Sequence, residues 1–139
     1  MAVTGNELLP GQGKIVITGV VKYDSDAEYG TDERCFINEL LGIAADEKLS
    51  VARARVEKGV TTALHRLHGV EERYVILRGR GSVEVGYKAA VEVGPLDVVV
   101  VPAETPQKIT NIGDEDLVFL CLCTPAFTQE CYEDLEKGR

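Results

Sequence analysis

Short runs of apolar residues, separated by turn-forming residues, make up most of this chain. Where apolar positions alternate with small or polar ones, as in residues 82–85 (SVEV), the pattern is typical of a strand with one wet face. The runs predict strands at 14–21, 50–57, 73–78, 82–86, 89–93, 97–101, 107–112 and 116–123. Residues 34–41 (RCFINELL) fit either a strand or a short helix, and the tail 127–136 could form one short helix.

The breaks between these runs support the same assignment. Gly79-Arg80-Gly81 and Gly94-Pro95 supply turn conformations that other residues resist. The predicted strands recur every ~8–12 residues, without a long helical periodicity between them. A parallel α/β fold would need crossover helices, which the sequence does not supply. The sequence therefore predicts an all-β fold, either a sandwich or a barrel.

Length and composition narrow the class of protein further. A chain of 139 residues with 45% apolar content is expected to form one globular domain. No apolar run approaches the ~20 residues of a membrane span, and no secretory signal is visible at the N-terminus. Fifteen basic and 23 acidic residues give a net charge of −8, so no basic face for nucleic acid is expected. We therefore expect neither a membrane nor a nucleic acid as partner.

The four cysteines indicate a reducing compartment. They form no CxxC pair and no spacing of the kind found in secreted disulfide frameworks. We therefore expect reduced thiols in a cytoplasmic protein. Cys131 lies in the polar tail and is expected to be the most exposed of the four.

The only two histidines of the chain lie close together in the stretch 59–79 (GVTTALHRLHGVEERYVILRG). Residues i and i+2 share a face in a strand, so His65 and His68 cannot both point inward from a regular strand. They could converge if a bulge or turn begins at Leu67. In the alternative arrangement, Leu67 lines the interior and His68 lies on the rim in solvent.

The spacing around these histidines resembles the first motif of the cupins, G-x5-H-x-H-x3/4-E-x6-G. Gly59, five residues and then His65 match its start, and Glu72, six residues and then Gly79 match its end. The resemblance covers about residues 50–124.

The second cupin motif, G-x5-P-x-G-x2-H-x3-N, resembles residues 102–111 (PAETPQKITN) in its spacing. Leu96 stands in place of its first glycine and Glu104 in place of the glycine after the proline. The resemblance implies a double-stranded β-helix, a jelly-roll barrel, that forms a single domain over residues 1–139. An N-terminal extension (1–49) would precede its core and a short tail (125–139) would follow.

Cupins hold one divalent metal ion through three histidines and one glutamate, so the resemblance also implies a candidate metal site. His65 and Glu72 stand at two of these positions, Leu67 stands at the second histidine position beside His68, and Gln107 stands at the third. The implied ligand set is His65, Glu72, Gln107 and His68, for Fe, Mn, Zn or Ni. Because an amide oxygen is a weaker donor than imidazole for these metals, the site could also be eroded and hold no metal.

The strand pattern also indicates which neighbouring side chains could act in the site. Glu72 alternates with Tyr74 and Ile76, so it should point into the barrel, where a carboxylate needs a metal or a cation. Arg53 and Arg55 share one face of the preceding strand and are its candidate partners, although both could equally face solvent. Arg53, Arg55 and Tyr74 are the candidate catalytic residues.

Two functions remain compatible with the resemblance. In the first, the barrel binds a small oxygenated or carbonyl-bearing ligand, with a divalent metal for isomerase-like or dioxygenase-like chemistry. In the second, the protein is a non-catalytic binding module with an eroded metal site, which Leu67 and Gln107 favour. Cupins commonly form homodimers, so we expect a homodimer, for which the pairing of edge strands is one route.

Overall fold

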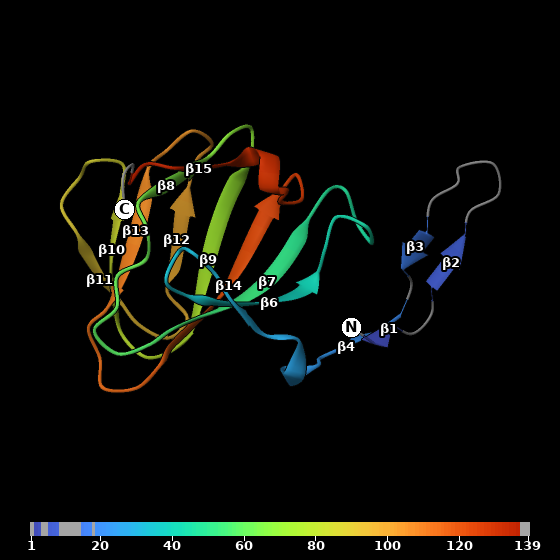
Figure 1. Ribbon diagram of the computed structural model, residues 1–139, viewed down its shortest axis with the longest axis horizontal. Coiled ribbons are helices and arrows are strands. Elements are labelled where there is room, and N and C mark those ends of the chain that lie inside the picture. The colour runs from blue at the N-terminus through green and yellow to red at the C-terminus, as the bar shows by residue number, and fades with distance from the viewer. Residues whose placement is uncertain (1, 4–5, 9–14, 18, 137–139) are drawn as a thin grey trace.

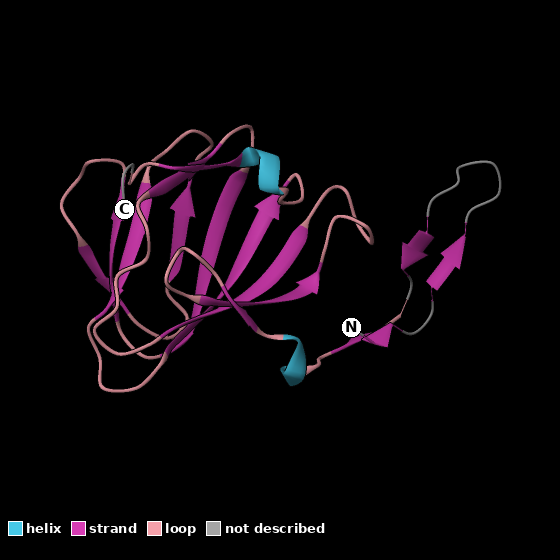
Figure 2. Cartoon of the chain, in the orientation of Figure 1, coloured by secondary structure: helices cyan, strands magenta, loops and turns pink. Residues whose placement is uncertain are grey.

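Two antiparallel sheets face each other in the computed structural model of the protein (Figure 1). The structure describes residues 2–3, 6–8, 15–17 and 19–136. Helical structure within this part of the chain is limited to two 3-10 turns, η1 (Ser25–Ala27) and η2 (Gln129–Cys131) (Figure 2). No helix among these residues has the length and apolar character that a membrane crossing requires. The all-β prediction is confirmed.

The larger sheet has six strands in the order β12-β9-β14-β7-β6-β5. They are β5 (Tyr29–Gly30), β6 (Phe36–Leu41), β7 (Ser50–Val56), β9 (Glu71–Arg78), β12 (Val98–Val101) and β14 (Leu117–Thr124). The smaller sheet has the order β11-β10-β13-β8-β15. Its strands are β8 (His65–Leu67), β10 (Gly81–Val85), β11 (Val91–Val93), β13 (Gln107–Asn111) and β15 (Tyr132–Asp134).

The N-terminal segment forms two further strand pairs. β1 (Ala2–Val3) pairs with β4 (Val21–Lys22), and β2 (Asn6–Leu8) pairs with β3 (Ile15–Ile17). Figure 1 shows β2 and β3 apart from the two large sheets. The strand predicted at 14–21 thus corresponds to β3 and the first residue of β4, while its residues 14 and 18 lie outside the described part of the chain.

Pairing with distant strands determines the secondary structure of the two segments that were ambiguous in the sequence. Residues 34–41 contain strand β6, which lies against β7. In the tail, the predicted short helix is limited to η2, and Tyr132–Asp134 instead pair with β8. An edge strand such as β8 offers unpaired backbone groups, and the tail satisfies them.

The tail also corrects one expectation about the cysteines. Cys131 is only 7% exposed and packs against Leu67, Val70 and Cys123. The prediction that it is the most exposed cysteine is wrong. The polar sequence around it does not show that β15 docks on the sheet and turns this side chain inward.

Apolar side chains at alternate positions of the strands fill the space between the two sheets. On β9, Tyr74 and Ile76 are buried, and Leu77 on the other face is 44% exposed. The main apolar cluster of the interior is made of Cys35, Ala54, Val56, Tyr74, Ile76, Val83, Val99, Val101, Ile109, Leu117 and Phe119. Apolar burial on this scale is the main stabilising term of such a sandwich.

Candidate functional site

A cavity of about 660 Å³ lies between the two sheets. Among the residues singled out in the sequence, His65 and Leu67 from β8 and Glu72 and Tyr74 from β9 line it. Its volume is within the usual range for small-molecule sites. The jelly-roll fold therefore brings the core of the first motif to the wall of one cavity.

A chain of hydrogen bonds joins Glu72, Gln107 and Tyr74. Gln107 begins β13, is fully buried, and donates from Nε2 to Oε1 of Glu72 over 2.8 Å. The hydroxyl of Tyr74 donates to Oε1 of Gln107. Both polar ends of the amide are thus engaged inside the barrel.

Burial changes the pKa values of Glu72 and Tyr74, the two acidic groups in this series of hydrogen bonds. Burial raises the pKa of Glu72, and the nearby imidazole of His65 opposes that effect. Burial, together with the charge of Glu72, raises the pKa of the Tyr74 hydroxyl well above its usual value. Tyr74 therefore acts as a hydrogen-bond donor here, and Glu72 takes up a proton more readily than an exposed carboxylate does.

His65 is held in one orientation by its neighbours. It is 5% exposed, and its Nδ1 lies 2.7 Å from the carbonyl oxygen of Ala63. Because a carbonyl can only accept, Nδ1 carries the proton of this hydrogen bond. The ring stacks on Tyr132 with 5.1 Å between centroids, and Nε2 lies 3.8 Å from the Glu33 carboxylate.

Leu67 faces the interior and His68 lies on the rim, as in the second of the two predicted arrangements. Leu67 is 3% exposed, whereas the His68 side chain is 46% exposed. The two ring nitrogens of His68 contact two carboxylates, Nδ1 that of Glu104 at 2.5 Å and Nε2 that of Glu133 at 2.7 Å. His68 is thus directed away from the cavity in which Glu72 lies.

Arg53 and Arg55 share a face of β7, as predicted, but it is the outer face of the sheet. Arg55 pairs with Glu28 at 2.7 Å and with Asp116 at 3.2 Å, and its guanidinium lies 4.2 Å from the centre of the Phe36 ring. Arg53 also reaches Glu28, at 3.3 Å. The expected pairing of these arginines with the interior carboxylate is not formed.

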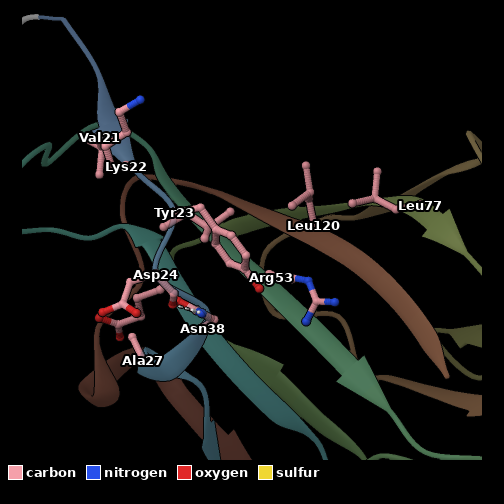
Figure 3. A pocket seen from close by; sticks show the side chains of 11 residues that line it. Val21, Lys22, Tyr23, Asp24, Ala27, Asn38, Arg53, Leu77 and Leu120 are labelled. Atoms are coloured by element: carbon pink, nitrogen blue, oxygen red, sulfur yellow. Dashed lines mark hydrogen bonds between the residues drawn. The ribbon is translucent and has the colours of Figure 1, made fainter. Parts of the chain in front are cut away.

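A smaller cavity of about 280 Å³ lies on this outer face, where residues 21–27 cross the six-stranded sheet (Figure 3). Tyr23 from the crossing segment and Arg53 and Leu120 from the sheet line it. The side-chain amide of Asn38 ties the segment down by donating to the carbonyl oxygen of Asp24 over 2.8 Å. None of the predicted metal ligands lines this second cavity.

The donor set does not fit the four-ligand metal centre that the resemblance implies. Gln107 directs an amide N–H at the carboxylate of Glu72, which is the wrong polarity beside a cation. Leu67 offers no donor atom, and His68 lies on the rim. Only His65 and Glu72 of the predicted ligands line the cavity. Among the described residues, no three His, Cys, Asp or Glu side chains form a group that could hold a metal ion.

Sequence reasoning missed the cavity residues that lie outside the motifs. Asp32 and Glu33 precede β6, and Tyr132 and Asp134 belong to β15. The sequence offered one signal for the first pair, the acidic cluster 24–33, which is ordinarily solvated surface. Nothing in the sequence indicated that the tail forms a wall of the cavity.

Comparison with known proteins agrees with this architecture. Residues 52–123 match the family model described as the cupin domain. MJ1618, an uncharacterised protein of Methanocaldococcus jannaschii, is 38% identical over 117 residues, which are 83% of this chain and 93% of that protein. Its similarity extends well beyond the two motifs.

Solved structures of the same fold include enzymes of different chemistry. Pac13, a nucleoside dehydratase, superposes with a TM-score of 0.69 at 18% identity, over 84% of this chain and 92% of its own. KdgF from a Halomonas species superposes with a TM-score of 0.69 at 14% identity, over 81% and 99%. The oxalate decarboxylase of Lactobacillus farciminis, in its formate complex, gives 0.68 at 22% identity, over 79% of this chain and 33% of that one. With the two motifs, the two-sheet barrel and the matched family model in agreement, the chain belongs to the cupin family.

Proposed function

We propose that this cupin binds a small oxygen-bearing molecule in the cavity between its sheets and does so without a metal ion. The observation that carries this proposal is the engagement of Gln107 with Glu72 and Tyr74. At the position where the motif has a metal-binding histidine, this chain has an amide that acts as a neutral link between two interior side chains. The cavity is retained, and a hydrogen-bonded network takes the place of the ligand set.

The side chains of the cavity support recognition of hydroxyl or carbonyl groups. With Nδ1 bonded to the Ala63 carbonyl, His65 in its neutral form offers Nε2 as an acceptor for a ligand hydroxyl. Glu72 holds a proton more readily than an exposed carboxylate because burial raises its pKa. Around these polar groups the cavity has apolar and aromatic walls, as in most small-molecule sites.

General acid–base catalysis on the bound molecule is a second candidate function. The observation that favours it is the placement of a buried carboxyl with a raised pKa beside an imidazole whose orientation is fixed. Such a pair can give and take a proton at one reacting group. Pac13, a protein of similar fold, is a nucleoside dehydratase, so enzyme activity is compatible with the fold.

Metal content tests the proposed function directly. We would purify wild type, His65→Ala and Gln107→His without metal-affinity steps and measure bound metals by elemental analysis. We expect wild type and His65→Ala to hold far less than one metal ion per chain. Gln107→His restores an imidazole opposite His65 and removes the amide N–H from Glu72, so it should take up added divalent metal. One metal ion per wild-type chain that is lost in His65→Ala would overturn the proposal.

We further propose that the protein is a homodimer formed through the outer face of β12 and β9. Val98 and Val100 point outward from the edge strand β12 and are each 57% exposed, and Leu77 extends the apolar surface onto β9. An edge strand with an exposed apolar face is well suited to pairing with its own copy across a two-fold axis.

A cytoplasmic location is part of the same proposal. All four cysteines are free thiols, and Cys35, Cys123 and Cys131 are buried in the barrel. Thiols that remain reduced are expected in a reducing compartment.

A further inference from the structure

We propose that the ligand of the cavity between the sheets is a small organic cation, an amine or a quaternary ammonium compound that also carries a hydroxyl group. This inference rests on the proposed function and names its ligand class. The described residues that line the cavity include no lysine and no arginine. The acidic side chains that line it are Asp32, Glu33, Glu39, Glu72 and Asp134.

Glu72 shows most clearly that a positive charge is needed. It is 7% exposed, and its hydrogen-bonding partners are the neutral amide of Gln107 at 2.8 Å and the thiol of Cys123 at 3.5 Å. A buried carboxylate without a full counter-charge is costly. The arginines that could have neutralised it, Arg53 and Arg55, are paired with Glu28 on the outer face. His65 acts on this carboxylate from nearby, and a bound quaternary or primary ammonium group would add a permanent counter-charge.

The electrostatic potential in the cavity has the same sign at several points. Glu72 on β9, Glu39 on β6 and Asp134 on β15 line the cavity from three different strands. Carboxylates therefore line the cavity from both sheets, β6 and β9 of the larger one and β15 of the smaller one. A negative potential over this space attracts a cation and opposes a phosphate or a carboxylate.

Aromatic walls give the cation a second kind of contact. Tyr74 and Phe119 lie with their ring centres 4.5 Å apart, and Tyr132 stacks on His65. Phe127 also lines the cavity. Ring faces attract ammonium groups, most strongly where water is excluded. Carboxylates and aromatic faces together are the chemistry that recognises an alkylammonium group.

The outward position of the arginines argues against an anionic ligand. The similar oxalate decarboxylase was solved with formate, an anion. Here Glu28 and Asp116 hold the guanidinium of Arg55 on the far side of the sheet. With no lysine or arginine on the described wall, an anion entering this cavity would meet five carboxylates and, as a basic side chain, only His65 among the described lining residues.

A series of isosteric probes tests the charge preference. Choline, its neutral isostere 3,3-dimethylbutan-1-ol and the anion 3,3-dimethylbutanoate have nearly the same shape and differ in charge; ethanolamine adds a primary amine. Binding to EDTA-treated protein would be measured by isothermal titration calorimetry at neutral pH. We expect choline or ethanolamine to bind at least about tenfold more tightly than the neutral alcohol, as one charge–carboxylate contact allows, and the anion not to bind.

Two adjacent glutamates on β9 provide a matched pair of variants. Glu72→Gln removes the interior charge and should abolish the preference for the cation. Glu71→Gln removes a charge from the exposed neighbouring position and should leave the preference unchanged. If Glu72→Gln fails to fold, as judged by thermal unfolding, Glu33→Gln at the cavity wall replaces it and should weaken cation binding at least about threefold.

The outcomes separate this inference from the proposed function. Equal affinity for choline and the neutral alcohol, or tightest binding of the anion, would overturn the cationic ligand and leave the cavity as a binding site. An unchanged cation preference in both glutamate variants would also overturn it. If no probe binds, the cationic ligand is excluded. The metal content of the purified protein still tests the proposed function, because that measurement does not depend on any probe.

Discussion

At the scale of single residues, the two polar departures from the cupin motifs, Glu104 and Gln107, each form a side-chain hydrogen bond with another residue of the motif region. Glu104 replaces a motif glycine and contacts His68, which lies one position beyond the expected histidine. Gln107 replaces a histidine and bonds the motif glutamate, Glu72. Glu104 adopts a φ of +67°, a conformation that favours glycine, and its carboxylate accepts from the backbone N–H of Gly69. The buried amide of Gln107 thus has partners at both of its polar ends, as buried polar groups require, and this pairing is what supports the proposed metal-free site.

The two glycines that frame the first motif have different physical roles, which gives a prediction at this scale. Both have a positive φ, +77° at Gly59 and +89° at Gly79. A Cβ at position 79 would lie 2.8 Å from the carbonyl oxygen of Asp116, whereas a Cβ at position 59 would meet nothing within 4 Å. Both alanine variants should lose about 1–2 kcal/mol for the backbone conformation, and Gly79→Ala should lose about 1–3 kcal/mol more.

Urea unfolding of the two variants measures this difference. Gly59→Ala serves as the control for the backbone cost alone. Equal losses of unfolding free energy in the two variants would show that the close approach of β9 to the start of β14 does not require glycine at position 79.

At the scale of elements, His68 joins three segments at the rim of the barrel. It lies in the turn between β8 and β9 and contacts Glu104 from the loop before β13 and Glu133 from β15. Arg66 on β8 shares the carboxylate of Glu133 at 2.8 Å. Because Tyr132 and Asp134 of β15 line the cavity, these contacts help to hold one of its walls in place.

This cluster predicts a pH dependence of stability. Hydrogen bonds to Glu133 and Glu104 raise the pKa of His68 above its ordinary value of 6.5. The folded state therefore binds the proton more tightly than the unfolded chain does. The stabilisation is fully present below about pH 6.5 and is lost as the pH rises through the folded-state pKa. Because His68, Arg66 and Gly69 lower the pKa values of the two glutamates, both stay ionised throughout this window.

Thermal unfolding of wild type and His68→Gln from about pH 5.5 to about pH 9 checks this prediction. Wild type should unfold at a higher temperature than the variant at the acidic end, and the difference should shrink toward the alkaline end. A difference that stays constant across the range, or that grows with pH, would contradict the assignment of a protonated His68 to the cluster.

At the scale of the whole molecule, one face of the six-stranded sheet encloses the cavity, and the other presents an apolar surface at its β12 and β9 end. The proposed dimer would cover Val98 and Val100 on β12, so light scattering coupled to size exclusion should give the mass of two chains. Changing both valines to lysine should yield a monomer with little loss of thermal stability, because both side chains already face outward.

Val91→Lys is the matched control for this change. It places one lysine, half of the added charge, on β11, the edge strand of the other sheet, where Val91 is 61% exposed; Val98→Lys alone is its equal in charge on β12. The control should remain dimeric. A monomeric wild type, or a lysine pair on β12 that leaves the dimer intact, would exclude β12 as the interface.

Local sequence patterns determined most of the strands and part of the site. Alternation along β9 placed Glu72, Tyr74 and Ile76 inside the barrel, and the spacing from Gly59 to Gly79 identified the family. Both features depend on neighbours within a few residues, which the sequence displays directly. The same local rule showed that His65 and His68 would not share the interior of a regular strand.

Only the tertiary structure decided what surrounds those residues. The pairing of β15 with β8 buried Cys131 and brought Tyr132 onto His65, and Glu28 from a distant segment held Arg53 and Arg55 on the outer face. The carboxylates of the cavity come from β6, β9, β15 and the loop before β6, far apart along the chain. Alternation along a strand divides the side chains between two faces, but it does not determine which face is buried. Which of them faces a ligand is fixed by the sheets and loops that pack against each face, and these contacts join residues that the sequence keeps far apart.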